Sequence, residues 1–339
     1  MSVRSANTGD RAVKAFLDVL PRAADVRVEE SVLDLSSVDV LVGGRPVEVK
    51  WVGDGALGDV RRALASRRAH PDVVVARRLS SGARALLTDE GIGWVDETGA
   101  AEVAIGSIVV SRTGRPPETI KKPPGWTPAV LAVTEALLCG ERGTVAATRR
   151  ATGLSEGSCT NALRTLTDFG LIEAERSRGR GSARRVGDRR ALLDAYASVA
   201  SALRPTIKLE VGVAWRDPIA GLEAAGQRWS RHDLAWAATS AAAASVLAPY
   251  LRTVTRTEVY VDTKAMVGLE AAAAVAGLKS IEGGRLILRP FPTPATDRLA
   301  ETIHGIRVAP WPRVYVDLVD SGVRGEEAAE HLWEVVGDR

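Results

Sequence analysis

The sequence predicts a mixed α/β protein with three parts: an α/β part, a mostly helical part with a β-hairpin, and a second mixed α/β part. Three observations support this division. Apolar residues change from helical spacing to short β-rich runs within residues 9–52, as is typical of an α/β domain. Residues 113–124 are rich in proline and basic residues, so we expect an extended linker there. Residues 128–200 then follow the order helix, helix, helix, hairpin, helix.

The bulk composition limits the class of protein. A length of 339 residues suits two or three domains of ordinary size. No run approaches the ~20 apolar residues of a membrane helix, and the first residues lack the pattern of a secretory signal. Cys139 and Cys159 cannot form a disulfide framework, and four scattered histidines offer no zinc site. We expect a soluble cytoplasmic protein with no membrane partner, located at the nucleoid if it binds DNA.

The first predicted domain covers residues 1–112, and residues 113–125 are the predicted linker. Residues 9–24 predict a helix, and residues 26–52 predict strands interrupted by Gly43 and Gly44. Further along the chain we expect a helix at 57–68, a buried strand at 72–76, a helix at 81–90 and two short strands between Trp94 and Val110. Helices that alternate with strands make this an α/β domain.

The second predicted domain covers residues 126–203. Residues 144–152 predict a short helix, Gly153 a turn, and Ser155 the N-cap of a second helix that ends near Asp168. Gly170 is expected in the left-handed conformation that closes a helix, after which residues 171–175 can start a strand. This order predicts a helix-turn-helix followed by a hairpin, or wing.

The second helix of this motif is expected to have one apolar and one polar face. The apolar face carries Ala162, Leu163, Leu166 and Phe169. The polar side chains on or near the other face, together with the N-cap, are Ser155, Ser158, Asn161, Arg164 and Thr165. Arginine can form two hydrogen bonds to guanine and asparagine two to adenine, while serine and threonine bind phosphates or base edges. The sequence therefore predicts double-stranded DNA as the partner.

The segment after the second helix is rich in arginine. It contains Arg176, Arg178, Arg180, Arg184 and Arg185, separated by glycine and serine. Such a composition suits phosphates or a narrow minor groove. The pattern LSEGSCTNALRTLTDFGLI and the arginines after it resemble the recognition helix and wing of winged-helix transcriptional regulators. Across residues 126–190, this resemblance implies a sequence-selective DNA-binding protein that regulates transcription.

A possible second function follows from the strands around Gly43 and Gly44. A two-residue turn at these glycines places Asp39 directly opposite Glu48. Strand alternation puts Lys50 on the same face. Two carboxylates that face each other destabilise a sheet unless they share a divalent cation.

These three residues resemble the core of PD-(D/E)XK nucleases, with Asp39 as the aspartate and Glu48 and Lys50 as the E-x-K motif. The resemblance implies a restriction-endonuclease-like domain, Mg²⁺ on Asp39 and Glu48, and Lys50 orienting the water that attacks a phosphodiester. No proline precedes Asp39, and Asp18 is the only carboxylate candidate on the first helix after Asp10. Two alternatives stay open: a metal-dependent DNA nuclease, or an inactive nuclease-like domain that binds DNA or a partner and needs no cofactor.

The third predicted domain covers residues 204–339. Strands are expected at 258–261, 285–288 and 313–318, between alanine-rich helices. Residues 236–251 and 309–330 resemble the C-terminal domain of the AbiEi-like type IV antitoxin family. This resemblance implies a repressor of its own operator with a cognate toxin as a further partner, and a palindromic operator would bind it as a homodimer. Three polar residues at predicted strand ends are expected to be structural, namely Asp262, Lys264 and Asp317.

Overall fold

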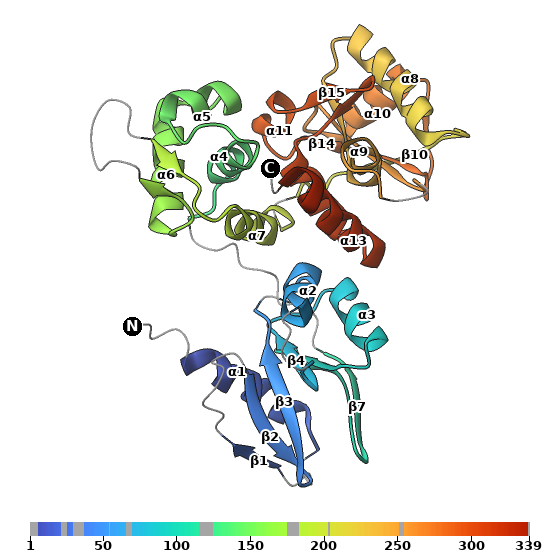
Figure 1. The fold of residues 1–339 in the computed structure, drawn as a ribbon. Coiled ribbons are helices and arrows are strands. Elements are labelled where there is room, and N and C mark those ends of the chain that lie inside the picture. The colour runs from blue at the N-terminus through green and yellow to red at the C-terminus, as the bar shows by residue number, and fades with distance from the viewer. Residues whose placement is uncertain are drawn as a thin grey trace. The chain divides into compact units, whose positions relative to one another are not determined.

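A computed structural model of the chain describes residues 6–21, 26–29, 37–53, 55–65, 70–114, 125–174, 183–202, 204–250 and 254–337 (Figure 1). The chain divides into two compact units, Met1–Ile120 and Lys121–Arg339. Their boundary falls inside the segment predicted as a linker, residues 113–125. Each unit contains a seven-stranded sheet together with helices, which confirms the prediction of a mixed α/β protein.

The first unit is one sheet with helices on both faces. Its strands, in the order in which they lie side by side, are β1 (Val26–Glu29), β2 (Ser37–Val42), β3 (Arg45–Trp51), β4 (Val73–Ala76), β5 (Gly93–Asp96), β6 (Ala100–Ile105) and β7 (Ile108–Thr113). Its helices are α1 (Ala6–Val19), α2 (Leu57–Ala65) and α3 (Ser81–Asp89). Strands β3, β4 and β5 are parallel because α2 and α3 connect them, and the other neighbours are antiparallel.

Two apolar clusters fix which residues point to which face of this sheet. On one face, Phe16 of α1 packs in a cluster with Val47 and Val49 of β3. On the other face, Val60 of α2 and Leu87 of α3 pack in a second cluster that includes strand residues of β4 and β5. Because strand residues alternate, the residues of β3 between and after these valines point toward the face of α2 and α3.

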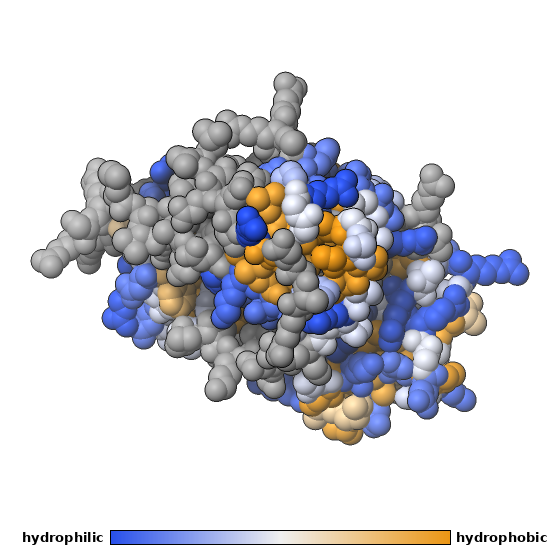
Figure 2. Space-filling model, turned by 90° about the horizontal axis from the view of Figure 1, so that it is seen from below, coloured by the Kyte–Doolittle hydropathy of each residue, from blue (hydrophilic) through white to orange (hydrophobic). Residues whose placement is uncertain are grey.

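The β-rich end of the first unit differs from the prediction. Two strands were expected between Trp94 and Val110, but turns at residues 97–99 and 106–107 divide this stretch into β5, β6 and β7. At the end of the sheet where β2 turns into β3, a cavity of about 620 Å³ is lined by both apolar residues, such as Val103 and Val109, and charged ones, such as Arg45 and Glu102. The view from below looks toward this end and shows apolar residues gathered beside hydrophilic ones (Figure 2).

The second unit begins with helices and continues into its own sheet. Its helices are α4 (Pro128–Leu138), α5 (Val145–Thr152), α6 (Glu156–Asp168), α7 (Arg189–Ala200), α8 (Pro218–Arg231), α9 (Ser240–Leu247), α10 (Met266–Val275), α11 (Pro294–Arg298), α12 (Trp311–Val319), α13 (Val323–Leu332) and a π-helical turn (Trp333–Gly337). Its strands are β8 (Glu173–Ala174), β9 (Arg184–Arg185), β10 (Leu209–Gly212), β11 (Trp236–Thr239), β12 (Thr257–Val261), β13 (Lys279–Ser280), β14 (Leu286–Pro290), β15 (Glu301–Ile303) and β16 (Ile306–Val308).

The large sheet of the second unit has the strand order β13-β10-β14-β12-β11-β16-β15. The pairs β12/β14 and β11/β16 are parallel, and the other pairs are antiparallel. The segments predicted as separate domains, 126–203 and 204–339, lie together in this unit and share one apolar core, which includes Leu163, Leu193 and Val259. No described helix is long and apolar enough to cross a membrane.

The prediction of a strand at residues 313–318 was wrong, because these residues belong to helix α12. Pro310 is the N-cap and Pro312 lies in the first turn, where a proline ring favours the start of a helix. Every residue from Trp311 to Leu318 is buried. Its valines, tyrosine and leucine are typical of a buried strand, whereas its polar residues, Arg313 and Asp317, lie one helical turn apart and pair with each other inside the protein.

Candidate nucleic-acid interface

Helix α5 ends and helix α6 begins at the residues that the sequence predicts. The Thr144 hydroxyl caps α5 by accepting the Ala147 N–H, and Gly153 ends this helix with a φ of +72°. The Ser155 hydroxyl then caps α6 by accepting the Ser158 N–H at 3.2 Å. Gly170 follows α6 with a φ of +69°. These predictions are confirmed, and they fix the direction in which α6 leaves the turn.

Helix α6 buries one face and exposes the other. The buried residues are Cys159, Ala162, Leu163 and Leu166. Phe169 was predicted on the same face but is 41% exposed, because α6 ends at Asp168 and the Phe169 ring stacks on Trp126 at a centroid distance of 5.9 Å. The opposite face of α6 therefore carries polar side chains that are free to meet another molecule.

The predicted contact residues of α6 lie on this outer face and are linked to one another. Asn161 and Arg164 are exposed, and an Arg164 guanidinium nitrogen donates to Asn161 Oδ1 at 3.0 Å. Ser158 and Thr165 are half-buried, and the Thr165 hydroxyl donates to the Asn161 carbonyl at 2.9 Å. An amide and a guanidinium held side by side present both the donors and the acceptor that base edges require.

A short ribbon of β8 and β9 follows α6. Arg184 pairs with Ala174 and also with Gly143, the residue just before the N-cap of α5, so the ribbon is attached to the start of that helix. Arg185 is exposed and lies 3.8 Å from the Glu173 carboxylate. Three predicted wing residues, Arg176, Arg178 and Arg180, lie outside the described residues.

Further arginines around this segment were not among the predicted contact residues. Arg142 and Arg189 border a cavity of about 320 Å³ at the base of the ribbon, together with the predicted Arg184 and Arg185. Arg298 of α11 donates to the Arg150 carbonyl at 3.2 Å and lies against Gly153. No local sequence pattern predicts this last contact, because 148 residues separate its partners.

The structure also tests the hairpin in the first unit. The backbone register pairs Asp39 with Glu48 and Ser37 with Lys50, as the glycine turn predicts. Lys50 is half-buried, and its ammonium donates to the Ala63 carbonyl at the end of α2 at 3.4 Å. Glu48 and Lys50 therefore lie on the face of α2 and α3, whereas α1 covers the opposite face. The side chain of Asp39 lies outside the described part of the chain.

The described residues do not form a metal site at this hairpin. Among them, no group of three histidine, cysteine, aspartate or glutamate side chains is arranged to hold a metal ion. A further carboxylate, that of Asp72, accepts the Glu48 N–H at 2.8 Å. Because the described side chains do not complete a coordination shell, no chemical step through a metal follows from them.

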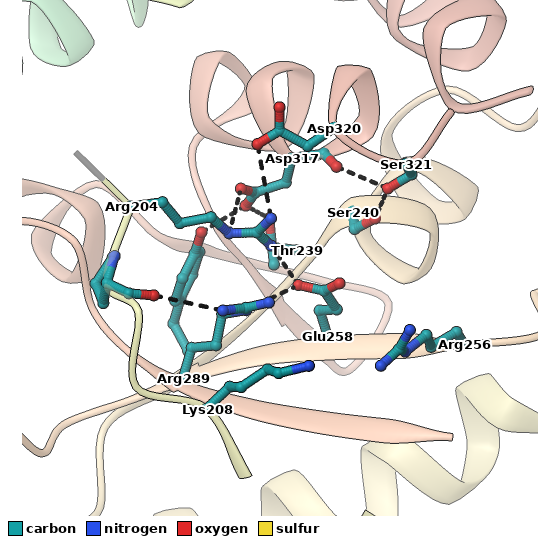
Figure 3. Close-up of polar contacts among 12 residues, drawn as sticks. Arg204, Lys208, Thr239, Ser240, Arg256, Glu258, Arg289, Asp317, Asp320 and Ser321 are labelled. Atoms are coloured by element: carbon teal, nitrogen blue, oxygen red, sulfur yellow. Dashed lines mark hydrogen bonds and ion pairs between the residues drawn. The ribbon is translucent and has the colours of Figure 1, made fainter. Parts of the chain in front are cut away.

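A buried ion network lies in the second unit (Figure 3). Asp317 of α12 binds the guanidinium of Arg313, and both residues are 1% exposed. The Tyr260 hydroxyl donates to the other Asp317 oxygen at 2.6 Å, and Arg204 lies 3.5 Å from the carboxylate. Burial, the largest single effect, raises the pKa of Asp317, but the charges of Arg313 and Arg204 and the hydrogen bonds from Arg313 and Thr239 together outweigh it, so this pKa lies below its ordinary value. Asp317 therefore stays ionised inside the protein.

Comparison with known proteins gave no relatives. No protein family, no curated protein and no solved structure matches the chain.

Proposed function

We propose that this protein binds double-stranded DNA sequence-selectively through α6 and the β8–β9 ribbon, and that it represses transcription. The observation that carries the proposal is the linked pair Asn161 and Arg164 on the exposed face of α6, opposite its core side chains. An α-helix with its side chains is about 10–12 Å across, and the major groove of DNA is about 12 Å wide, so the exposed face of α6 can enter the groove.

The residues around α6 support the same interpretation. The order α4, α5, α6, ribbon, with Gly143 joined to the ribbon, fits a winged helix-turn-helix. Arginines beside the helix supply charge for phosphates, which position a protein on DNA without selecting a sequence. The antitoxin resemblance makes an autorepressor the form of regulator we favour, with a toxin and a second copy of the chain as its protein partners.

Selection from a randomised duplex pool tests the proposal. The purified chain should enrich one short motif over several rounds, because base contacts from α6 discriminate between sequences. Enrichment of duplexes without any common motif would contradict sequence selectivity, and failure to retain duplex DNA at low salt would contradict the function itself.

The wing makes its own prediction. Replacing Arg178 and Arg180 by alanine should weaken binding to every duplex and lower the slope of log K against log salt by roughly one to two. Filter binding or fluorescence anisotropy across a salt series measures this slope. The exposed Arg231, at the end of α8, provides a control substitution that should leave the slope unchanged. An unaltered slope in the double variant would remove the wing from the interface.

A metal-dependent DNA nuclease is the second candidate function. The register of Asp39 with Glu48 favours it, as does the order of elements from α1 to β4, which fits a restriction-endonuclease-like core. The sequence has no proline before Asp39 and no clear inward carboxylate on its first helix, so we place the nuclease second. In the alternative that we prefer, the first unit binds DNA or another protein without cutting.

Plasmid nicking distinguishes these alternatives. We expect the wild-type chain with Mg²⁺ or Mn²⁺ to leave supercoiled plasmid intact, and Glu48→Gln to keep or raise thermal stability because it relieves repulsion between facing carboxylates. Agarose gels and thermal melting measure the two effects. Cleavage that requires the divalent ion and disappears in a folded Lys50→Ala variant would reverse our preference.

A further inference from the structure

A cavity of about 1030 Å³ lies in the second unit where β11 passes into α9. Its walls come from the start of α9, the start of β12, the end of α12 and the first turns of α13. Pockets for small organic molecules usually have volumes of about 300–1,000 Å³. The cavity is therefore large enough for a metabolite, and it lies apart in the sequence from α6 and the ribbon.

Two serine hydroxyls meet on one wall of this cavity (Figure 3). Ser240 is 5% exposed and has a φ of +52°, a conformation that serine rarely adopts. Its Oγ lies 3.3 Å from Oγ of Ser321, which donates to the Asp317 carbonyl at 2.8 Å. Because Ser321 donates its own proton to that carbonyl, it can only accept a hydrogen bond from Ser240. The Ser240 hydroxyl can instead turn and donate to a bound molecule.

Two of the three acidic groups of the cavity are paired with arginines. Glu258 binds Arg204 and lies 3.2 Å from Arg289. Asp320 accepts the Ser201 hydroxyl at 2.8 Å and lies 3.7 Å from Arg204. The third acidic side chain, Glu327, accepts the Tyr250 hydroxyl at 3.4 Å.

The two arginines that line the cavity are not fully neutralised by carboxylates. Arg256 is half-exposed and shares the Glu210 carboxylate with Lys208, so two cations there face one anion. Arg324 is exposed and makes no ion pair with any described residue. An arginine forms strong hydrogen bonds with phosphate and carboxylate oxygens, and serine hydroxyls add further donors. Counted together with their ion-pair partners, the described charged side chains at this cavity are five cations (Arg204, Lys208, Arg256, Arg289 and Arg324) and four carboxylates (Glu210, Glu258, Asp320 and Glu327), so one positive charge is left over and suits an anion.

We propose that this cavity binds a small organic anion, whose phosphate or carboxylate group is held by Arg256 and Arg324 and hydrogen-bonded by the hydroxyl of Ser240. The ligand site does not depend on the proposed DNA-binding function. Phosphate and carboxylate share the chemistry of a negatively charged oxygen group, so the experiment includes one probe of each kind.

Calorimetric titration of the full-length chain with inorganic phosphate and with succinate, at constant ionic strength, tests the site. We expect saturable binding of at least one probe. In the double variant Arg256→Gln, Arg324→Gln, its Kd should rise roughly 10- to 100-fold, since charged hydrogen bonds are lost. Ser240→Ala should weaken binding by a smaller factor. The control Arg231→Gln changes an exposed arginine of α8 outside the cavity and should bind as the wild type does.

The relative affinity of the two probes identifies the group that the cavity prefers. Saturable binding that the double variant loses and the control retains supports the site. Absence of saturable binding of both probes would overturn the proposal, and so would equal affinity in the wild type and the double variant. Neither result would bear on whether α6 binds DNA.

Discussion

Replacing Asp317 by asparagine is expected to lower the free energy of unfolding by about 3–5 kcal/mol, because it leaves a buried charge without its partner. Arg313 is 1% exposed, and its guanidinium binds Asp317 through two nitrogens. Asparagine keeps the shape of the side chain and can still accept from Tyr260, but it cannot balance the positive charge. Chemical denaturation at neutral pH measures the loss.

A double variant separates charge from packing at the same position. Replacing Asp317 by leucine and Arg313 by methionine removes both charges and keeps similar volumes, so part of the lost stability should return, while the Tyr260 and Thr239 hydroxyls remain without their acceptor. A loss below about 1 kcal/mol in Asp317→Asn would contradict the account, because it would mean that the ion pair is not isolated from water.

Replacing Glu135 by glutamine is expected to stabilise the protein at pH 8 by about 3 kcal/mol and to change little at pH 4.5. Glu135 of α4 is fully buried, and one of its oxygens accepts the Thr296 hydroxyl at 3.1 Å while the other has no described partner. Burial raises its pKa from 4.5 to about 7, an effect that Arg313 partly opposes and Asp317 reinforces. Cys139 and Tyr196 are the other titratable groups that interact with Glu135.

The sign of the pH dependence of stability follows from whether the folded or the unfolded state binds the Glu135 proton more tightly. The folded state binds the Glu135 proton more tightly than the unfolded state, so this contribution to stability is complete below pH 4.5 and is lost as pH rises to about 7. Glutamine resembles the protonated form at every pH. Urea denaturation of the wild type and the variant from pH 4.5 to 8 should give free energies of unfolding whose difference grows with pH. A difference that stays constant across this range would contradict an uncharged Glu135 below neutral pH.

Features fixed by residues close together in the chain could be predicted from the sequence. The ends of α5 and α6 follow from Thr144, Gly153 and Ser155, which act on their own helix termini. The register of Asp39 with Glu48 follows from the two-residue turn at Gly43 and Gly44. In both cases the hydrogen bonds that decide the structure span only a few residues.

Features fixed by distant contacts could not be predicted. The hydrogen bond from Thr296 to Glu135 joins residues 161 positions apart, and no local pattern marks either partner. The same holds for Arg298 beside Gly153. Helix α12 was mistaken for a strand because its run of β-branched and aromatic residues is typical of a buried strand, and the pairing of Arg313 with Asp317 inside the protein depends on the whole fold.

Alanine substitution at Asn161 and Arg164 tests most directly whether α6 selects a DNA sequence. Each substitution should cost about 1–3 kcal/mol of binding free energy on the preferred duplex and much less on random duplex. Both side chains are exposed, so neither change should affect folding. A larger loss on the preferred site is the predicted result. An equal loss on both duplexes, or no loss on either, would contradict base recognition by this helix.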